Sequence, residues 1–166
     1  MNRLLLLFVI GISLLSANGP VRVTVGADLL FTANTKLIDG KRVGLITNHT
    51  ALLSNGKHLA DALKEYPKTT LTVLFGPEHG IRGDAPDGKK VNDTIDARTG
   101  VPVISLYGKI NKPTPEMLKN VDVLIFDIQD VGARFYTFIS TMFLCMEAAA
   151  ENNIPFIVLD RPNPIT

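Results

Sequence analysis

The chain has 166 residues, of which 46% are hydrophobic and 20% charged, and its formal net charge at pH 7 is +1. This length is enough for one domain with a buried core, and the sequence shows neither a basic excess nor a Lys/Arg cluster. The composition therefore excludes bulk electrostatic attraction to nucleic acid or anionic lipid, so specific binding has to come from a local site.

The first 19 residues have the pattern of a secretory signal peptide. Arg3 precedes an uninterrupted apolar run over residues 4–12, and small residues follow at positions 17–19. The run is shorter than the roughly 18 apolar residues that a membrane span needs, although an uncleaved anchor is the alternative. No cysteine follows the run to accept a lipid. We expect cleavage close to Gly19 and a secreted or periplasmic protein over residues 20–166.

After the leader, strand and helix signals alternate, which predicts an α/β fold with a mostly parallel sheet. Short apolar runs predict strands at residues 43–46, 71–75, 103–106, 121–126 and 154–159. The last two runs are apolar throughout apart from Asp122, as expected of strands that are buried on both faces.

Helical spacing of apolar residues predicts a helix over residues 57–66 and another around 138–149. The single cysteine, Cys145, lies in the second pattern and is predicted to be a core residue. Thr114 and Pro115 predict the N-cap and first position of a brief helix. Residues 76–100 have no apolar periodicity and are predicted to form a long loop, which in a compact domain usually has a function.

Polar side chains follow four of the predicted strands. They are Thr47-Asn48-His49, Glu78-His79, Asp127-Ile128-Gln129-Asp130 and Asp160-Arg161. Because the carboxyl ends of parallel strands lie along one edge of the sheet, these groups are expected to converge on a cleft. Glu78, in a loop shaped by glycine and proline, is a candidate proton donor.

The sequence supports neither a nucleotide site nor a metal site in such a cleft. The first strand is followed by Thr-Asn-His-Thr-Ala and lacks the glycines that admit a pyrophosphate. His49, His79, Asp127 and Asp130 include no close ligand pair of the His-Glu-x-x-His type, so neither a metal nor another cofactor is expected. His58 is predicted to lie on a helix at the surface.

Four long motifs, in order, resemble those of the bacterial exo-β-N-acetylmuramidases, long catalogued as a domain of unknown function. The resemblance covers about residues 25–166 and rests on residues 44–50, 77–83, 126–137 and 159–164. It implies a Rossmann-like N-terminal domain, with helices on both faces of the sheet, that forms a cleft with a second, C-terminal domain. On this resemblance we expect the chain to contain only the first domain, with the C-terminal domain absent, and to have little or no activity alone.

The resemblance further implies that Glu78, in the Pro-Glu-His-Gly motif, is the catalytic acid. Glycoside cleavage usually needs a second carboxylate as base or nucleophile, for which Asp130 and Asp127 are the candidates. For both aspartates, capping the following helix or pairing with Arg134 is the alternative role.

An enzyme selective for N-acetylmuramic acid should offer a cation to its lactyl carboxylate, and arginine matches a carboxylate with two donors. Arg82, Arg134 and Arg161 all lie near predicted strand ends; the alternative is that each braces an aspartate. The full set of predicted substrate-binding residues is Asn48, His49, His79, Arg82, Asp127, Gln129, Arg134, Tyr136, Asp160 and Arg161.

Two functions follow as hypotheses. The first is a secreted glycosidase that releases terminal non-reducing N-acetylmuramic acid from peptidoglycan fragments during cell-wall recycling. The second is a non-catalytic module that binds muropeptides. Both predict peptidoglycan-derived sugars or muropeptides as partners, with no nucleic acid and no membrane after signal cleavage, and only the first predicts turnover.

Overall fold

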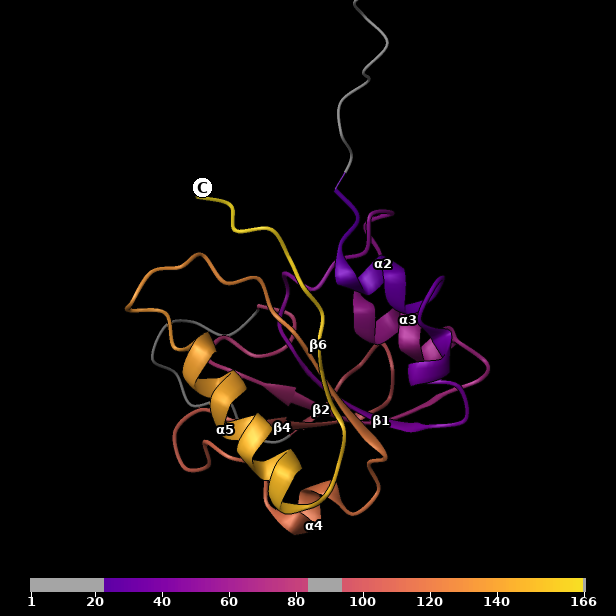
Figure 1. Ribbon diagram of the computed structural model, residues 1–166. Helices are drawn as coiled ribbons and strands as arrows, with labels where there is room; N and C mark the ends of the chain where they lie inside the picture. The colour runs from indigo at the N-terminus through magenta and orange to yellow at the C-terminus, as the bar shows by residue number, and fades with distance from the viewer. Residues whose placement is uncertain (1–22, 84–93, 166) are drawn as a thin grey trace, which may run out of the picture.

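The structure is a computed structural model that describes residues 23–83 and 94–165 (Figure 1). The predicted signal peptide at residues 1–19 lies outside these residues, as does part of the predicted long loop. No helix in the described ranges is long and apolar enough to cross a membrane.

A six-stranded sheet forms the centre of the fold, in the order β3-β4-β2-β1-β5-β6. Its pairs are all parallel except β3 with β4. The strands are β1 (Arg42–Thr47), β2 (Thr70–Gly76), β3 (Thr94–Ile95), β4 (Pro102–Ser105), β5 (Val123–Asp127) and β6 (Phe156–Val158). The predicted α/β fold with a mostly parallel sheet is confirmed, and every predicted strand is present.

Two predictions about strands were wrong. β3 lies inside the predicted loop over residues 76–100, because a two-residue edge strand is too short to produce an apolar pattern. β6 is apolar but not buried on both faces: it is the outermost strand of the sheet, and Val158 remains 48% exposed. An apolar run shows that a strand packs against something, but it does not show on how many sides.

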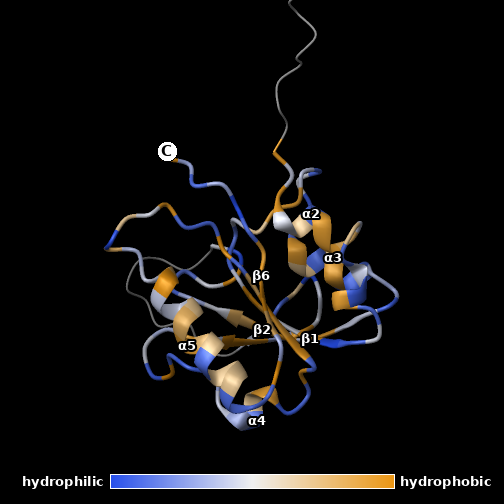
Figure 2. Cartoon of the chain, viewed as in Figure 1, coloured by the Kyte–Doolittle hydropathy of each residue, from blue (hydrophilic) through white to orange (hydrophobic). Residues whose placement is uncertain are grey.

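Helices cover both faces of the sheet, as predicted (Figure 1). One face carries α2 (Gly26–Leu30), the 3₁₀ turn η1 (Thr35–Leu37) and α3 (Leu59–Glu65). Leu30 of α2, Ile38 directly after η1 and Leu63 of α3 are buried in the core on this face. The other face carries α4 (Pro115–Leu118) and α5 (Phe138–Glu151). Figure 2 shows the apolar strands of the sheet between these helices.

Short-range signals predicted α4 and α5 correctly. Thr114 is the N-cap of α4, with Pro115 at its start. Cys145 is fully buried on the inner face of α5, together with Ala148 and Ala149. Burial raises the pKa of its thiol to about 12, so Cys145 is a neutral core residue.

His58 does not lie on a helix surface as predicted. It is the N-cap of α3 and only 6% exposed. Its Nδ1 accepts a hydrogen bond from the Ala60 backbone N–H at 3.2 Å, and its Nε2 lies 2.9 Å from the carbonyl oxygen of Asn48. Burial lowers the pKa of His58. The neutral ring therefore fixes the start of α3 to the end of β1.

The strand order also determines where a ligand can bind. From β1 the chain crosses to β2 and β4 on one side, and it then returns to β5 and β6 on the other side. The loops after β1 and β5 therefore leave the sheet in opposite directions, which opens a crevice at the carboxyl ends of these two strands.

Candidate active site

The loop after β2 carries Glu78 and His79 to this crevice. His79 has φ 70°, in the left-handed region where a residue with a Cβ atom is strained by about 1–3 kcal/mol. Gly83, with φ 77°, ends the turn beside His49: a Cβ atom at position 83 would lie 2.9 Å from the His49 ring. The loop therefore depends on a glycine in order to pack against a histidine of the neighbouring strand end.

A hollow at the crevice, which we call the main pocket, has a volume of about 620 Å³. It is lined by Asn48, His49, Thr50, Glu78, His79, Gln129, Val131, Phe135, Tyr136, Thr137 and Phe138. Among these described lining residues, Glu78 is the sole carboxylate. The rings of Phe135, Tyr136 and Phe138 form one wall, with centroids of neighbouring rings 5.2 and 5.6 Å apart.

Short hydrogen bonds join the ends of β1 and β5 under this pocket. Thr50 donates from Oγ1 to Oδ1 of Asn48 at 2.6 Å, and its oxygen accepts the backbone N–H of Gln129 at 2.9 Å. The side-chain amide of Gln129 donates to the carbonyl oxygens of Asp130 and Pro162. Asn48 and Gln129 therefore shape the floor of the pocket, and Thr50, which sequence analysis missed, links them.

Glu78 has a further partner that sequence analysis missed. The Tyr107 hydroxyl is hydrogen-bonded to the Glu78 carboxylate, and this bond raises the pKa of Tyr107. Tyr107 follows β4 by two residues. The rule that polar residues at strand ends converge would have found Tyr107, had the rule also been applied to the predicted strand at residues 103–106.

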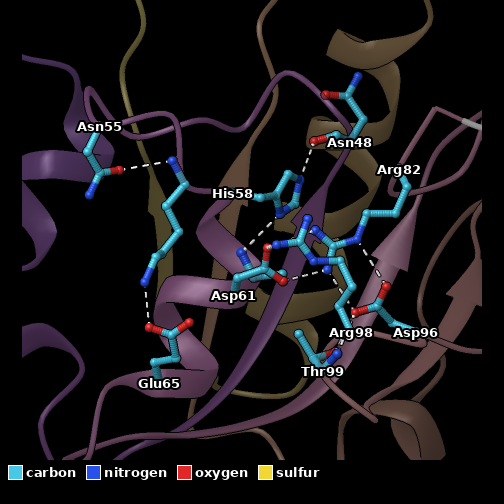
Figure 3. A network of polar contacts seen from close by, with 11 residues as sticks. Asn48, Asn55, His58, Asp61, Glu65, Arg82, Asp96, Arg98 and Thr99 are labelled. Carbon is cyan, nitrogen blue, oxygen red and sulfur yellow. Dashed lines mark hydrogen bonds and ion pairs between the residues drawn. The ribbon is translucent and has the colours of Figure 1, made fainter.

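Arg82 does not reach the main pocket. Its guanidinium is held below the loop by two aspartates, Asp61 on α3 and Asp96 after β3, at 2.7 and 2.8 Å (Figure 3). Arg98 adds a second cation to Asp61 at 2.8 Å. Of the two roles considered for Arg82, the structure shows the brace to an aspartate. This network ties the Glu78 loop to α3 and to the edge of the sheet.

Asp96 should make the stability of the protein sensitive to acid. Burial opposes ionisation, but hydrogen bonds from Arg82 and Thr99 lower the pKa of Asp96 from 3.8 to about 2. Stabilisation by the ionised form is therefore complete above pH 3.8 and is lost as the pH falls through about 2. We expect the free energy of unfolding, measured by urea denaturation, to fall over this range less steeply in Asp96→Asn than in the wild type. Equal slopes would contradict the prediction.

Arg161 is likewise engaged by an aspartate. Its Nε and Nη2 atoms contact the two carboxylate oxygens of Asp127 at 2.5 and 2.9 Å. Asp127 is fully buried at the end of β5, and burial raises the pKa of Asp127 while Arg161 opposes this shift. Arg161 also donates to the carbonyl oxygen of Leu52. Neither side chain lines the main pocket.

Asp130 lies beside the main pocket and does not line it. Its Oδ1 accepts the backbone N–H groups of Val131 and Gly132 at 2.6 and 3.0 Å, so the carboxylate shapes the following loop. Together with Asp160 it lines a separate hollow of about 300 Å³ between the end of β5 and α5. The structure thus does not bring Asp130 or Asp127 into the pocket that contains Glu78.

Arg134 and Tyr136 lie in the exposed loop before α5. In the described parts of the chain Arg134 makes no ion pair, so the alternative pairing with Asp127 or Asp130 is not seen. The described residues also contain no cluster of three or more His, Cys, Asp or Glu side chains that could hold a metal ion.

A doubly wound, mostly parallel α/β sheet with a pocket at its switch point is the arrangement of Rossmann-like domains, which bind their ligands there. Within that class, residues 43–166 match the family model described as exo-beta-N-acetylmuramidase NamZ, N-terminal. The chain belongs to this family, as the motifs in the sequence had indicated.

Similar proteins support the assignment. Peptidoglycan beta-N-acetylmuramidase NamZ of Bacillus subtilis (strain 168) is 61% identical over 143 residues, which are 86% of this chain and 34% of the relative. Crystal structures of two DUF1343 family proteins of Bacteroides fragilis NCTC 9343 share the fold. One is 53% identical with a TM-score of 0.79, covering 88% of this chain and 36% of its own. The other is 41% identical with a TM-score of 0.71, and the match covers 86% of this chain and 36% of that protein. The chain thus spans about a third of the length of these relatives.

Proposed function

We propose that the main pocket belongs to a glycosidase site that releases terminal non-reducing N-acetylmuramic acid from peptidoglycan fragments during cell-wall turnover. The observation that carries the proposal is the placement of Glu78: a carboxyl group held by a strained loop and by Tyr107, in a pocket at the switch point of the sheet. The activity that the name of the Bacillus relative gives supports the choice of sugar.

In this reaction the bond between C1 of the muramic acid and the bridging oxygen breaks. Glu78 donates its proton to that oxygen, which leaves as a hydroxyl on the second sugar. Water adds its oxygen to C1 and gives up a proton. The imidazoles of His49 and His79, which line the same pocket, are groups that can accept this proton.

A non-catalytic muropeptide-binding module is the second candidate, favoured by the absence of a second carboxylate among the described residues that line the pocket. One experiment separates the two functions. The purified chain, and any longer product of its gene, are incubated with the disaccharide N-acetylmuramyl-β-1,4-N-acetylglucosamine, and free sugars are quantified by mass spectrometry. Release of N-acetylmuramic acid supports the glycosidase, whereas saturable binding without release supports the module.

Arg134 is our proposed partner for the lactyl carboxylate, because Arg82 and Arg161 are already paired with aspartates. We expect Arg134→Gln to weaken binding of N-acetylmuramic acid by about 1.5–3 kcal/mol, as for one charge-assisted hydrogen bond, with little effect on N-acetylglucosamine. Titration calorimetry with both sugars measures the difference. Arg42→Gln, at a partly exposed arginine at the start of β1, is the control. An unchanged preference in Arg134→Gln would rule out this role.

We also propose that the protein is exported, on the basis of the apolar run after Arg3 and the small residues before Gly19. N-terminal sequencing of protein recovered outside the cytoplasm should show a chain that begins close to residue 20. A membrane-embedded chain that still begins at Met1 would instead indicate an uncleaved anchor.

A further inference from the structure

Glu78 lines two hollows. Besides the main pocket it borders a second one of about 420 Å³, which we call the side pocket. Thr137, at the start of α5, is the other residue that lines both. Both volumes lie within the range of about 300–1,000 Å³ that is typical of small-molecule sites. Glu78 and Thr137 therefore form the divide between two neighbouring sites, each large enough for a ligand.

The walls of the side pocket are rich in neutral polar groups. The loop after β4 contributes Tyr107 and Asn111, and the first turns of α5 contribute Ser140 and Thr141. Hydroxyl and amide groups of this kind pair with the hydroxyl and acetamido groups of a neutral sugar. Among the described residues that line the side pocket there is no cation, and Glu78 is its sole charged group.

The acid of a glycosidase has to reach the oxygen between two sugars, so the sugars lie on either side of it. We propose that the side pocket binds the leaving sugar, an N-acetylglucosamine unit, while the main pocket binds the terminal N-acetylmuramic acid. This assignment rests on the proposed function. Glu78, on the divide, then lies where the bridging oxygen passes from one pocket to the other.

The orientation follows from size and charge. N-acetylmuramic acid is the bulkier sugar, and the main pocket is the larger of the two. This sugar also carries the lactyl carboxylate, for which the described residues of the side pocket offer no cation and one carboxylate, Glu78. N-acetylglucosamine is neutral and suits the side pocket. Tyr107 has two roles in this arrangement, because it lines the side pocket and holds the Glu78 carboxylate with its hydroxyl.

Blocking the side pocket provides the kinetic test. Ser140→Phe is compared with Ser54→Phe, a control at an exposed loop position. Two substrates are used: the disaccharide, and N-acetylmuramyl fluoride, whose leaving group is not a sugar. We expect Ser140→Phe to lower kcat/KM on the disaccharide about tenfold more than on the fluoride, mainly through KM. Equal losses on both substrates, or no loss on either, would overturn the assignment.

Binding provides a test that does not depend on turnover. In amide NMR spectra of the wild-type chain, N-acetylglucosamine should shift the signals of Gly108, Asn111 and Ser140. N-acetylmuramic acid should shift those of Thr50 and Gln129. Shifts by N-acetylglucosamine confined to the main pocket, or none at all, would refute the leaving-sugar site. If neither this chain nor any longer product of its gene cleaves either substrate, the glycosidase proposal fails, and the NMR result still decides whether the side pocket binds this sugar.

Discussion

In a protein that also carries the family's second domain, replacing Glu78 with glutamine is expected to lower kcat on the muramyl disaccharide by about 10²–10⁴-fold, the usual contribution of a general acid. Glutamine preserves the size of the side chain and its hydrogen bond to Tyr107, but it has no proton of suitable acidity for the leaving oxygen. Substrate binding and the folded state should persist, so KM and the melting temperature should change little. Steady-state kinetics and thermal denaturation measure both effects.

Glu147→Gln is the matched control for this substitution. Glu147 lies on α5 and pairs with Lys112 at 2.9 Å, away from the main pocket. Its replacement should leave kcat unchanged. A substrate with a good leaving group, such as a nitrophenyl glycoside, should be less impaired by Glu78→Gln than the disaccharide, because it needs less protonation. Near-normal turnover of the disaccharide by Glu78→Gln would show that Glu78 is not the acid.

Replacing Arg161 with alanine is expected to destabilise the folded chain by about 3–5 kcal/mol, the usual effect of leaving a buried charge without its partner. The side chain of Arg161 is only 8% exposed and that of Asp127 is fully buried, so water cannot replace the guanidinium. A loss of this size is comparable to the whole stability of many domains. Urea denaturation of the variant and the wild type measures it.

Two comparisons make this prediction specific. Arg42→Ala breaks an ion pair with Asp122 in which both partners are partly exposed to solvent, and it should cause a much smaller loss. The double substitution Arg161→Leu with Asp127→Leu removes both charges, and it should be less destabilising than Arg161→Ala alone. If Arg161→Ala unfolded at the same urea concentration as the wild type, the buried pair would not contribute to stability.

Most strands and helices could be predicted from the sequence, because each of them depends on a local pattern of apolar residues. Five apolar runs correctly predicted five strands, and the apolar spacing around Cys145 correctly predicted α5. These patterns are visible in the sequence because the buried positions of a helix or strand recur at a fixed spacing. β3 was missed because its two residues are too few to show an alternating pattern. The division of the chain into domains and the roles of individual site residues stay predictions.

The family and the position of Glu78 after a strand could be predicted from the chain alone, since four motifs in order and a strand running into a Pro-Glu-His-Gly turn are continuous stretches of sequence. Which charged side chains pair with each other depends on how the elements pack in space. Arg82 pairs with residues 21 and 14 positions away, and Arg161 with a residue 34 positions away. His58 is buried because Asn48, 10 positions earlier, provides a carbonyl oxygen. Ion pairs and hydrogen bonds act over a few ångströms in space, whereas sequence spacing fixes such distances only within one helix or strand. The partners of a side chain in a loop are therefore set by how the sheet and its helices pack.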